Sequence, residues 1–73
     1  MQYASGEPVK LGDKVRLGQD AGGVVVGVIN TGEYAPGFPK SEWEYLEAGV
    51  MINFPSLGMI HYAALEPGIE LIA

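Results

Sequence analysis

Glycine and proline interrupt the chain at short intervals. Eleven glycines and five prolines lie among its 73 residues, and the segments between them are rich in valine, isoleucine, leucine and tyrosine. Short runs of such residues bounded by turn residues are typical of an all-β barrel or sandwich. The sequence therefore predicts one all-β domain over residues 1–73, a small barrel of five or six short antiparallel strands with one short helix in a long connecting loop.

Alternation and apolar runs place the strands. Polar and apolar residues alternate in Lys14–Leu17, which favours a strand with one solvated face, and the nearly continuous apolar run Val24–Asn30 favours a buried central strand in which Gly27 marks a bend. The polar stretch Gly18–Gly23 is expected to be a turn, and Pro55 to Gly58 the loop of a hairpin. The expected strands are Gln2–Ala4, Lys14–Leu17, Val24–Asn30, Val50–Phe54, Met59–Tyr62 and Ile69–Ile72.

The long connection spans residues 32–49 and holds four of the seven aromatic and four of the nine acidic residues. Its two prolines disfavour helix in the first half. Ser41 followed by Glu44 has the spacing of a helix capping box, and Gly49 suits a left-handed helix stop. We therefore expect a helix over Glu42–Ala48, with Trp43 and Leu46 directed at the barrel.

Charge argues against nucleic acid as the partner. The formal net charge is −5, and the excess of acidic residues lies in the later half of the chain. Phosphate neutralisation dominates affinity for DNA and RNA, so an acidic surface repels both, whereas it speeds encounter with a basic protein. Aromatic residues are enriched at interface hot spots. The candidate partner-binding residues are Glu33, Tyr34, Phe38, Glu42, Trp43, Glu44, Tyr45 and Glu47.

These residues also have a purely structural interpretation. Trp43 and Phe38 are suited to plug the open end of the barrel, and the glutamates to form a solvated face with helix-capping charges. Tyr34 and Tyr45 are the rings that we expect to be exposed. The sequence leaves the two interpretations open.

Signals for catalysis, metal binding and membrane insertion are missing from the sequence. The chain has no cysteine, and its lone histidine, His61, has no acidic or histidine neighbour, so it is expected to be solvated or hydrogen-bonded rather than a metal ligand. We expect no enzyme activity, no cofactor and no metal. The apolar runs fall short of the roughly 20 residues of a membrane span. The N-terminus does not resemble a signal peptide, and a cytoplasmic location is expected.

Two resemblances guide the functional interpretation. Leu11–Leu17 followed by Gly23–Ile29 resembles the opening of KOW-type, SH3-like β-barrels, which implies an SH3-like barrel and, less readily given the charge, an accessory module that binds nucleic acid or a ribonucleoprotein. In size, acidity and its Tyr/Trp-rich acidic loop, the chain resembles small bacterial immunity proteins. That resemblance implies an inhibitor that occludes a basic toxin or effector. A structural homodimer is the third possibility.

Overall fold

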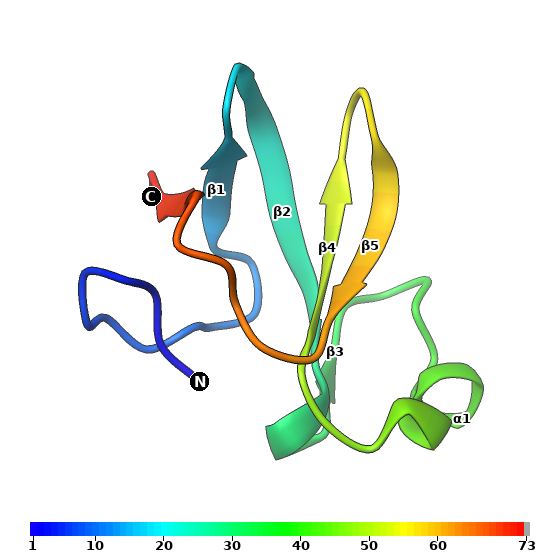
Figure 1. Cartoon of the computed structure of the whole chain (residues 1–73). Coiled ribbons are helices and arrows are strands. Elements are labelled where there is room, and N and C mark those ends of the chain that lie inside the picture. Colours follow the sequence, from blue (N-terminus) through cyan, green and yellow to red (C-terminus); the bar gives the residue numbers. More distant parts are fainter. Residues whose placement is uncertain (73) are drawn as a thin grey trace.

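A computed structural model, described here for residues 1–72, shows a single antiparallel sheet of six strands (Figure 1). Its strand order is β5-β4-β2-β1-β6, and β3 pairs with β2 beside this path. Two 3₁₀ helices and one α-helix lie in the connections. The elements are β1 (Lys14–Leu17), β2 (Asp20–Val28), η1 (Ile29–Thr31), β3 (Glu33–Tyr34), α1 (Lys40–Trp43), η2 (Glu44–Leu46), β4 (Val50–Phe54), β5 (Gly58–Tyr62) and β6 (Ile69–Leu71).

The predicted class is confirmed, with six antiparallel strands and one short α-helix in a long connecting loop. The barrel is not closed, however, because β5 and β6 stand at the two ends of the strand path and neither pairs with the other within residues 1–72. After β5 the chain turns, with Ile69 N–H donating to Glu66 O, and the three-residue β6 pairs only with β1. The chain thus forms an open, barrel-like sheet.

Strand β2 is longer than expected and organises the sheet. One of its edges is shared by β1 and β3, and β4 occupies the other. The predicted turn Gly18–Gly23 is wrong beyond Gln19, because β2 already begins at Asp20. The glycines permit this pairing, since a Cβ on Gly23 would lie 2.6 Å from Phe54 Cε1 and 2.9 Å from Val15 Cγ2.

A β-bulge in β2 distributes its valines between the two faces of the sheet. Val25 pairs with Ile52 and Gly27 with Met51, so that Val26 is the extra residue. Bulges bend a strand and increase its twist. A Cβ on Gly27 would lie 2.7 Å from Met51 Cε. The bulge beside Gly27 agrees with the expectation that this residue marks a bend.

The hydrophobic residues accordingly form two clusters. Val50, Ile52 and Phe54 point to one face of β4 and Met51 to the other, as alternation along a strand requires. The main core consists of Tyr3, Val9, Val15, Val25, Val28, Val50, Ile52, Phe54, Tyr62 and Ile69. The second cluster consists of Val26, Ile29 and Met51 with the partly buried Val24, Tyr34, Ala35, Phe38, Trp43, Leu46 and Met59.

The N-terminal segment covers the main core without forming the expected strand over Gln2–Ala4. It makes only an isolated bridge between Gln2 and Pro8. The Tyr3 ring is 3% exposed, and its hydroxyl donates to Asp13 Oδ2 at 2.9 Å. Burial, this hydrogen bond and the charges of Asp13 and Glu7 raise the pKa of Tyr3 well above its usual value of 10.0.

The hairpin predicted from Val50 to Tyr62 is confirmed. All five residues of β4 pair in regular register with β5, from Val50 with Tyr62 to Phe54 with Gly58. Gly58 has a φ of 81°, a conformation that glycine adopts without strain at the end of the connecting loop.

Candidate functional site

The connection between β3 and β4 covers the face of the sheet that carries the second cluster. Phe38, Trp43 and Leu46 pack there against the buried residues Val26, Ile29 and Met51. The segment lies at the end of the molecule opposite the β4–β5 turn (Figure 1). The expectation that Trp43 and Phe38 plug the open end of a barrel is therefore wrong: they cover a sheet face. The expectation that Trp43 and Leu46 point at the sheet is confirmed.

The helix within this connection differs from the prediction. It begins at Lys40, with Pro39 in an extended conformation as its N-cap, and it passes at Glu44 into the 3₁₀ helix η2. Ser41 therefore lies inside the first turn, and the expected capping box is wrong. Proline fixes its own φ near the helical value and readily precedes a helix, so the turn starts directly after Pro39.

The end of η2 is a strained γ-turn centred on Glu47. Glu47 has a φ of 69° and a ψ of −37°, and Ala48 N–H donates to Leu46 O at 2.8 Å. Glu47 is the one non-glycine residue with positive φ within residues 1–72. A γ-turn of this hand is rare and costs free energy, and such strain clusters at functional sites. Glycine was expected to end the helix at Gly49, but the helical conformation ends at Leu46, and Glu47 follows with a positive φ.

The segment is anchored to the sheet immediately after this turn. Gly49 N–H donates to Asn30 Oδ1 at 2.8 Å, and Ile29 N–H donates to Gly49 O at 2.9 Å. His61 Nε2 donates to Ala48 O at 2.9 Å, which assigns the proton to Nε2 because a carbonyl can only accept. His61 is thus a hydrogen-bonded structural residue, as predicted. No sequence signal pointed to these long-range anchors.

The structure separates the candidate residues into covered rings and an exposed ridge. Tyr34, Phe38 and Trp43 come together in the second cluster. The expected exposure of Tyr34 is wrong, because its hydroxyl is fully buried. The Tyr34 hydroxyl and Trp43 Nε1 are the buried side-chain polar atoms without a hydrogen-bond partner within residues 1–72. Each unpaired atom costs about 1–3 kcal/mol, and both lie in the second cluster.

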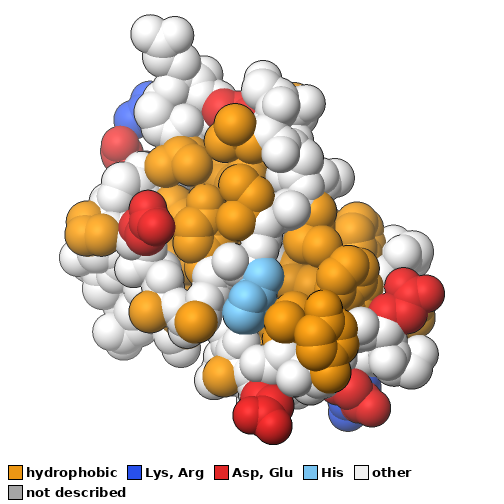
Figure 2. All heavy atoms as spheres, turned by 45° about the vertical axis from the view of Figure 1, so that its right-hand side comes forward, with side chains coloured by type: hydrophobic (Ala, Val, Ile, Leu, Met, Phe, Trp, Pro, Cys, Tyr) orange, Lys and Arg blue, Asp and Glu red, His pale blue; other side chains and the backbone are white. Residues whose placement is uncertain are grey.

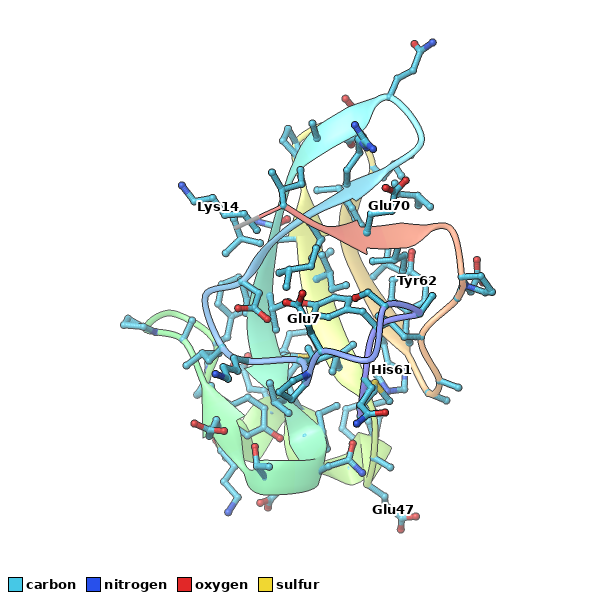
Figure 3. The ribbon with its side chains drawn as sticks, turned by 90° about the vertical axis from the view of Figure 1, so that its left-hand side faces the viewer. Glu7, Lys14, Glu47, His61, Tyr62 and Glu70 are labelled. Atoms are coloured by element: carbon cyan, nitrogen blue, oxygen red, sulfur yellow. The ribbon has the colours of Figure 1, made fainter. Side chains whose placement is uncertain are left out.

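Tyr45 and the three glutamates around it form the exposed part, which we call the acidic ridge (Glu42, Glu44, Tyr45 and Glu47). The Tyr45 side chain is 71% exposed, as expected, and all three glutamates are exposed. Figure 3 shows Glu47 pointing away from the body of the molecule. Glu33 is also exposed, but it lies on β3, where it accepts a hydrogen bond from Thr31 Oγ1 at 2.8 Å. Glu33 is therefore placed on a different element from the ridge.

Concave sites are small. A depression of about 140 Å³ is lined by Tyr3, Ala4, Ser5, Pro67, Ile69, Glu70 and Leu71. Pockets for small molecules usually enclose about 300–1,000 Å³. Within residues 1–72, no three His, Cys, Asp or Glu side chains are grouped so as to hold a metal ion, and no helix is both long and apolar enough to span a bilayer.

Comparison of the chain with protein-family models, with curated proteins and with solved structures found no match.

Proposed function

We propose that the chain is a non-catalytic protein-binding module that binds a basic protein through the acidic ridge. The observation that carries the proposal is the position of Tyr45: a ring that is 71% exposed, between exposed glutamates, on the 3₁₀ helix η2 that directly precedes the strained turn at Glu47. Tyrosine is enriched at binding hot spots because it adds a large contact area with few rotatable bonds. The glutamates would steer a cationic partner toward it.

Charge elsewhere in the molecule supports a basic protein over a nucleic acid. The chain has only four cationic side chains against nine acidic ones, and one of the four, Arg16, is paired with Glu70 across β1 and β6 at 3.0 Å. Neutralising phosphates requires several lysines or arginines on one surface. The KOW-like function is therefore the weaker proposal.

The most specific form of this proposal is an immunity-type inhibitor. The acidic ridge would cover the basic active site of a bacterial toxin or effector and exclude its substrate. We propose the cytoplasm as the compartment, because a chain without cysteine needs no oxidising environment.

Photo-crosslinking from position 45 tests the proposal. Benzoylphenylalanine placed at Tyr45 should capture a basic protein from a lysate of the source organism, identified by mass spectrometry. The same group at Leu57 is the matched control, because Leu57 is 55% exposed but lies in the β4–β5 turn. Equal capture from both positions would count against the ridge.

Calorimetry with the purified captured protein then measures the contribution of the ring. Tyr45→Ala should weaken binding at least about tenfold, as expected for a hot-spot residue, whereas Leu57→Ala should change it by less than about twofold. Raising the salt concentration should slow association. Unchanged affinity in Tyr45→Ala, or tight RNA binding that weakens steeply with salt, would contradict the proposal.

A further inference from the structure

The free edge of β5 has the properties of a docking site for an extended peptide segment. β5 is the last strand of the sheet on its side, and its residues make no backbone hydrogen bond outside the ladder with β4 within residues 1–72. In an antiparallel pair, half of the N–H and C=O groups of an outer strand point away from the partner strand. These groups are a template for one more strand.

The edge lacks the protection that sheet edges usually carry. A lysine, a proline, a bulge or a very short length normally prevents an edge strand from pairing with another chain. β5 (Gly58–Tyr62) contains neither lysine nor proline, has five residues and pairs with β4 without a register shift. The opposite edge strand, β6, has only three residues and carries Glu70, which is paired with Arg16. Of the two edge strands, β5 is therefore the better site for an added strand.

Hydrophobic side chains border β5 on both faces of the sheet. Ile60 lies on the main-core face with the partly buried Leu65 and Leu71. On the other face, Met59 lies in the second cluster with Trp43 and Leu46. Figure 2 shows the result: His61 sits between two groups of hydrophobic side chains, and acidic side chains lie around them. Because successive side chains of a strand point to opposite faces, an added strand would place half of its side chains beside Ile60 and the other half on the face that carries Met59 and the connecting segment.

The charges around the β5 edge determine what kind of strand can pair with it. The exposed acidic residues on the neighbouring segments include Glu42, Glu44 and Glu47 of the ridge and Glu66 after β5. A second copy of this chain, with a net charge of −5, would bring two acidic rims together, and like charges across an interface cost free energy. A strand that alternates apolar with basic residues would instead direct its apolar side chains to the main-core face and its cations to the face on which the connecting segment carries the acidic ridge.

We infer that the partner binds by adding a strand, with alternating apolar and basic residues, to the free edge of β5. The inference rests on the proposed function and specifies how the same basic partner is recognised. The acidic ridge adjoins this edge, because His61 on β5 is hydrogen-bonded to Ala48 at the end of the connecting segment. Ridge and edge therefore form one continuous surface.

Two synthetic peptides test the inference. The first is a capped seven-residue peptide in which lysine and valine alternate, and the second is the same peptide methylated at every amide nitrogen, which keeps the charge but cannot pair as a strand. The first peptide should shift the NMR signals of Gly58–Tyr62 and slow their amide exchange. The methylated peptide should bind at least tenfold more weakly.

A pair of lysine variants locates the binding. His61→Lys puts a cation in the middle of the edge and should weaken binding of the first peptide at least tenfold. Gln19→Lys adds the same charge at an exposed position in the β1–β2 turn, away from β5, and should weaken it less than threefold. Circular dichroism of both variants checks that they are folded, since a lysine at position 61 can still donate to Ala48 O.

Several results would overturn strand addition. These are equal affinity for the two peptides, no binding of the first at millimolar concentration, or shifts confined to residues 40–48. The last result would leave the proposed function intact, because it would show binding at the ridge without pairing. A dimer in light scattering, with β5 amides protected in the absence of peptide, would identify a second copy as the occupant instead.

Discussion

Glu47 has a backbone conformation with positive φ, which favours glycine. An L-residue with positive φ costs about 1–2 kcal/mol, while glycine loses about 0.5–1 kcal/mol more conformational entropy on folding. Glu47→Gly should therefore raise the free energy of unfolding by up to about 1 kcal/mol, measured by urea denaturation. If Glu47 serves binding, the same variant should bind the partner more weakly.

Glu44→Gly is the matched control for this prediction. Glu44 has a φ of −63°, so glycine relieves no strain there while it removes the same charge from the same segment. The control should lose about 0.5–1 kcal/mol of stability. An equal loss in both variants would show that the Glu47 turn is not strained.

At the scale of elements, the junction between the connecting segment and β4 depends on close contact with β5. Gly49 has a φ of 105°, and a Cβ added there would collide with the Tyr62 backbone carbonyl and lie 2.9 Å from His61 Nε2. The backbone oxygen cannot move aside without breaking the β4–β5 ladder. Gly49→Ala should cost more than about 3 kcal/mol or prevent folding.

Gly37→Ala separates collision from backbone strain. Gly37 has a similar φ of 88°, but a Cβ there would meet no atom within 4 Å. Its substitution should cost only about 1–2 kcal/mol. Urea denaturation of the two variants measures the difference, and similar costs would contradict the assigned contact between Gly49 and β5.

Elements with a local signal were predicted well, whereas those that depend on distant contacts were not. Alternation in Lys14–Leu17, the Gly58 turn and the apolar run of Val50–Phe54 were sufficient to place β1, β4 and β5. The start of β2 was missed because the fit of Gly23 against Phe54 is visible only in the folded chain.

The candidate site was predicted from the sequence only in part, because local patterns were visible there and distant contacts were not. Tyr45 and its neighbouring glutamates are exposed because they point away from the sheet. The burial of Tyr34 follows from pairing of Gly27 with Tyr34 beside the bulge, and the register of that pairing leaves no local pattern in the sequence. The γ-turn at Glu47 could likewise not be predicted, because no residue next to it in the sequence requires a positive φ.

At the scale of the whole molecule, the main core gives the stability a dependence on alkaline pH. The pKa of Tyr3 is raised by burial first and then by its hydrogen bond to Asp13, and burial together with the charge of Glu66 raises the pKa of Tyr62. The unfolded chain, with the usual pKa of 10.0, loses these protons before the folded chain does. The contribution of these two tyrosines to the free energy of unfolding should therefore be fully present below pH 10 and fall as the pH rises further.

Tyr3→Phe should reduce the decrease in the free energy of unfolding above pH 10. The decrease that remains should be the part caused by Tyr62. At neutral pH the substitution should cost about 1–3 kcal/mol, because Asp13 loses a hydrogen-bond donor. Urea denaturation at a series of pH values measures both effects. Tyr45→Phe, at an exposed ring, is the control. An unchanged alkaline decline in Tyr3→Phe would contradict the assignment.

The bulge at Val26 has a consequence for how such a chain can change over generations. Because Val25 and Val28 serve one cluster while Val26 serves the other, the residues that hold the domain together are largely distinct from those beneath the acidic ridge. Substitutions in the second cluster, beneath the ridge, can then change the shape of the ridge while the main core keeps the chain folded. If the ridge binds the proposed partner, substitutions beneath it would change the binding specificity without unfolding the chain.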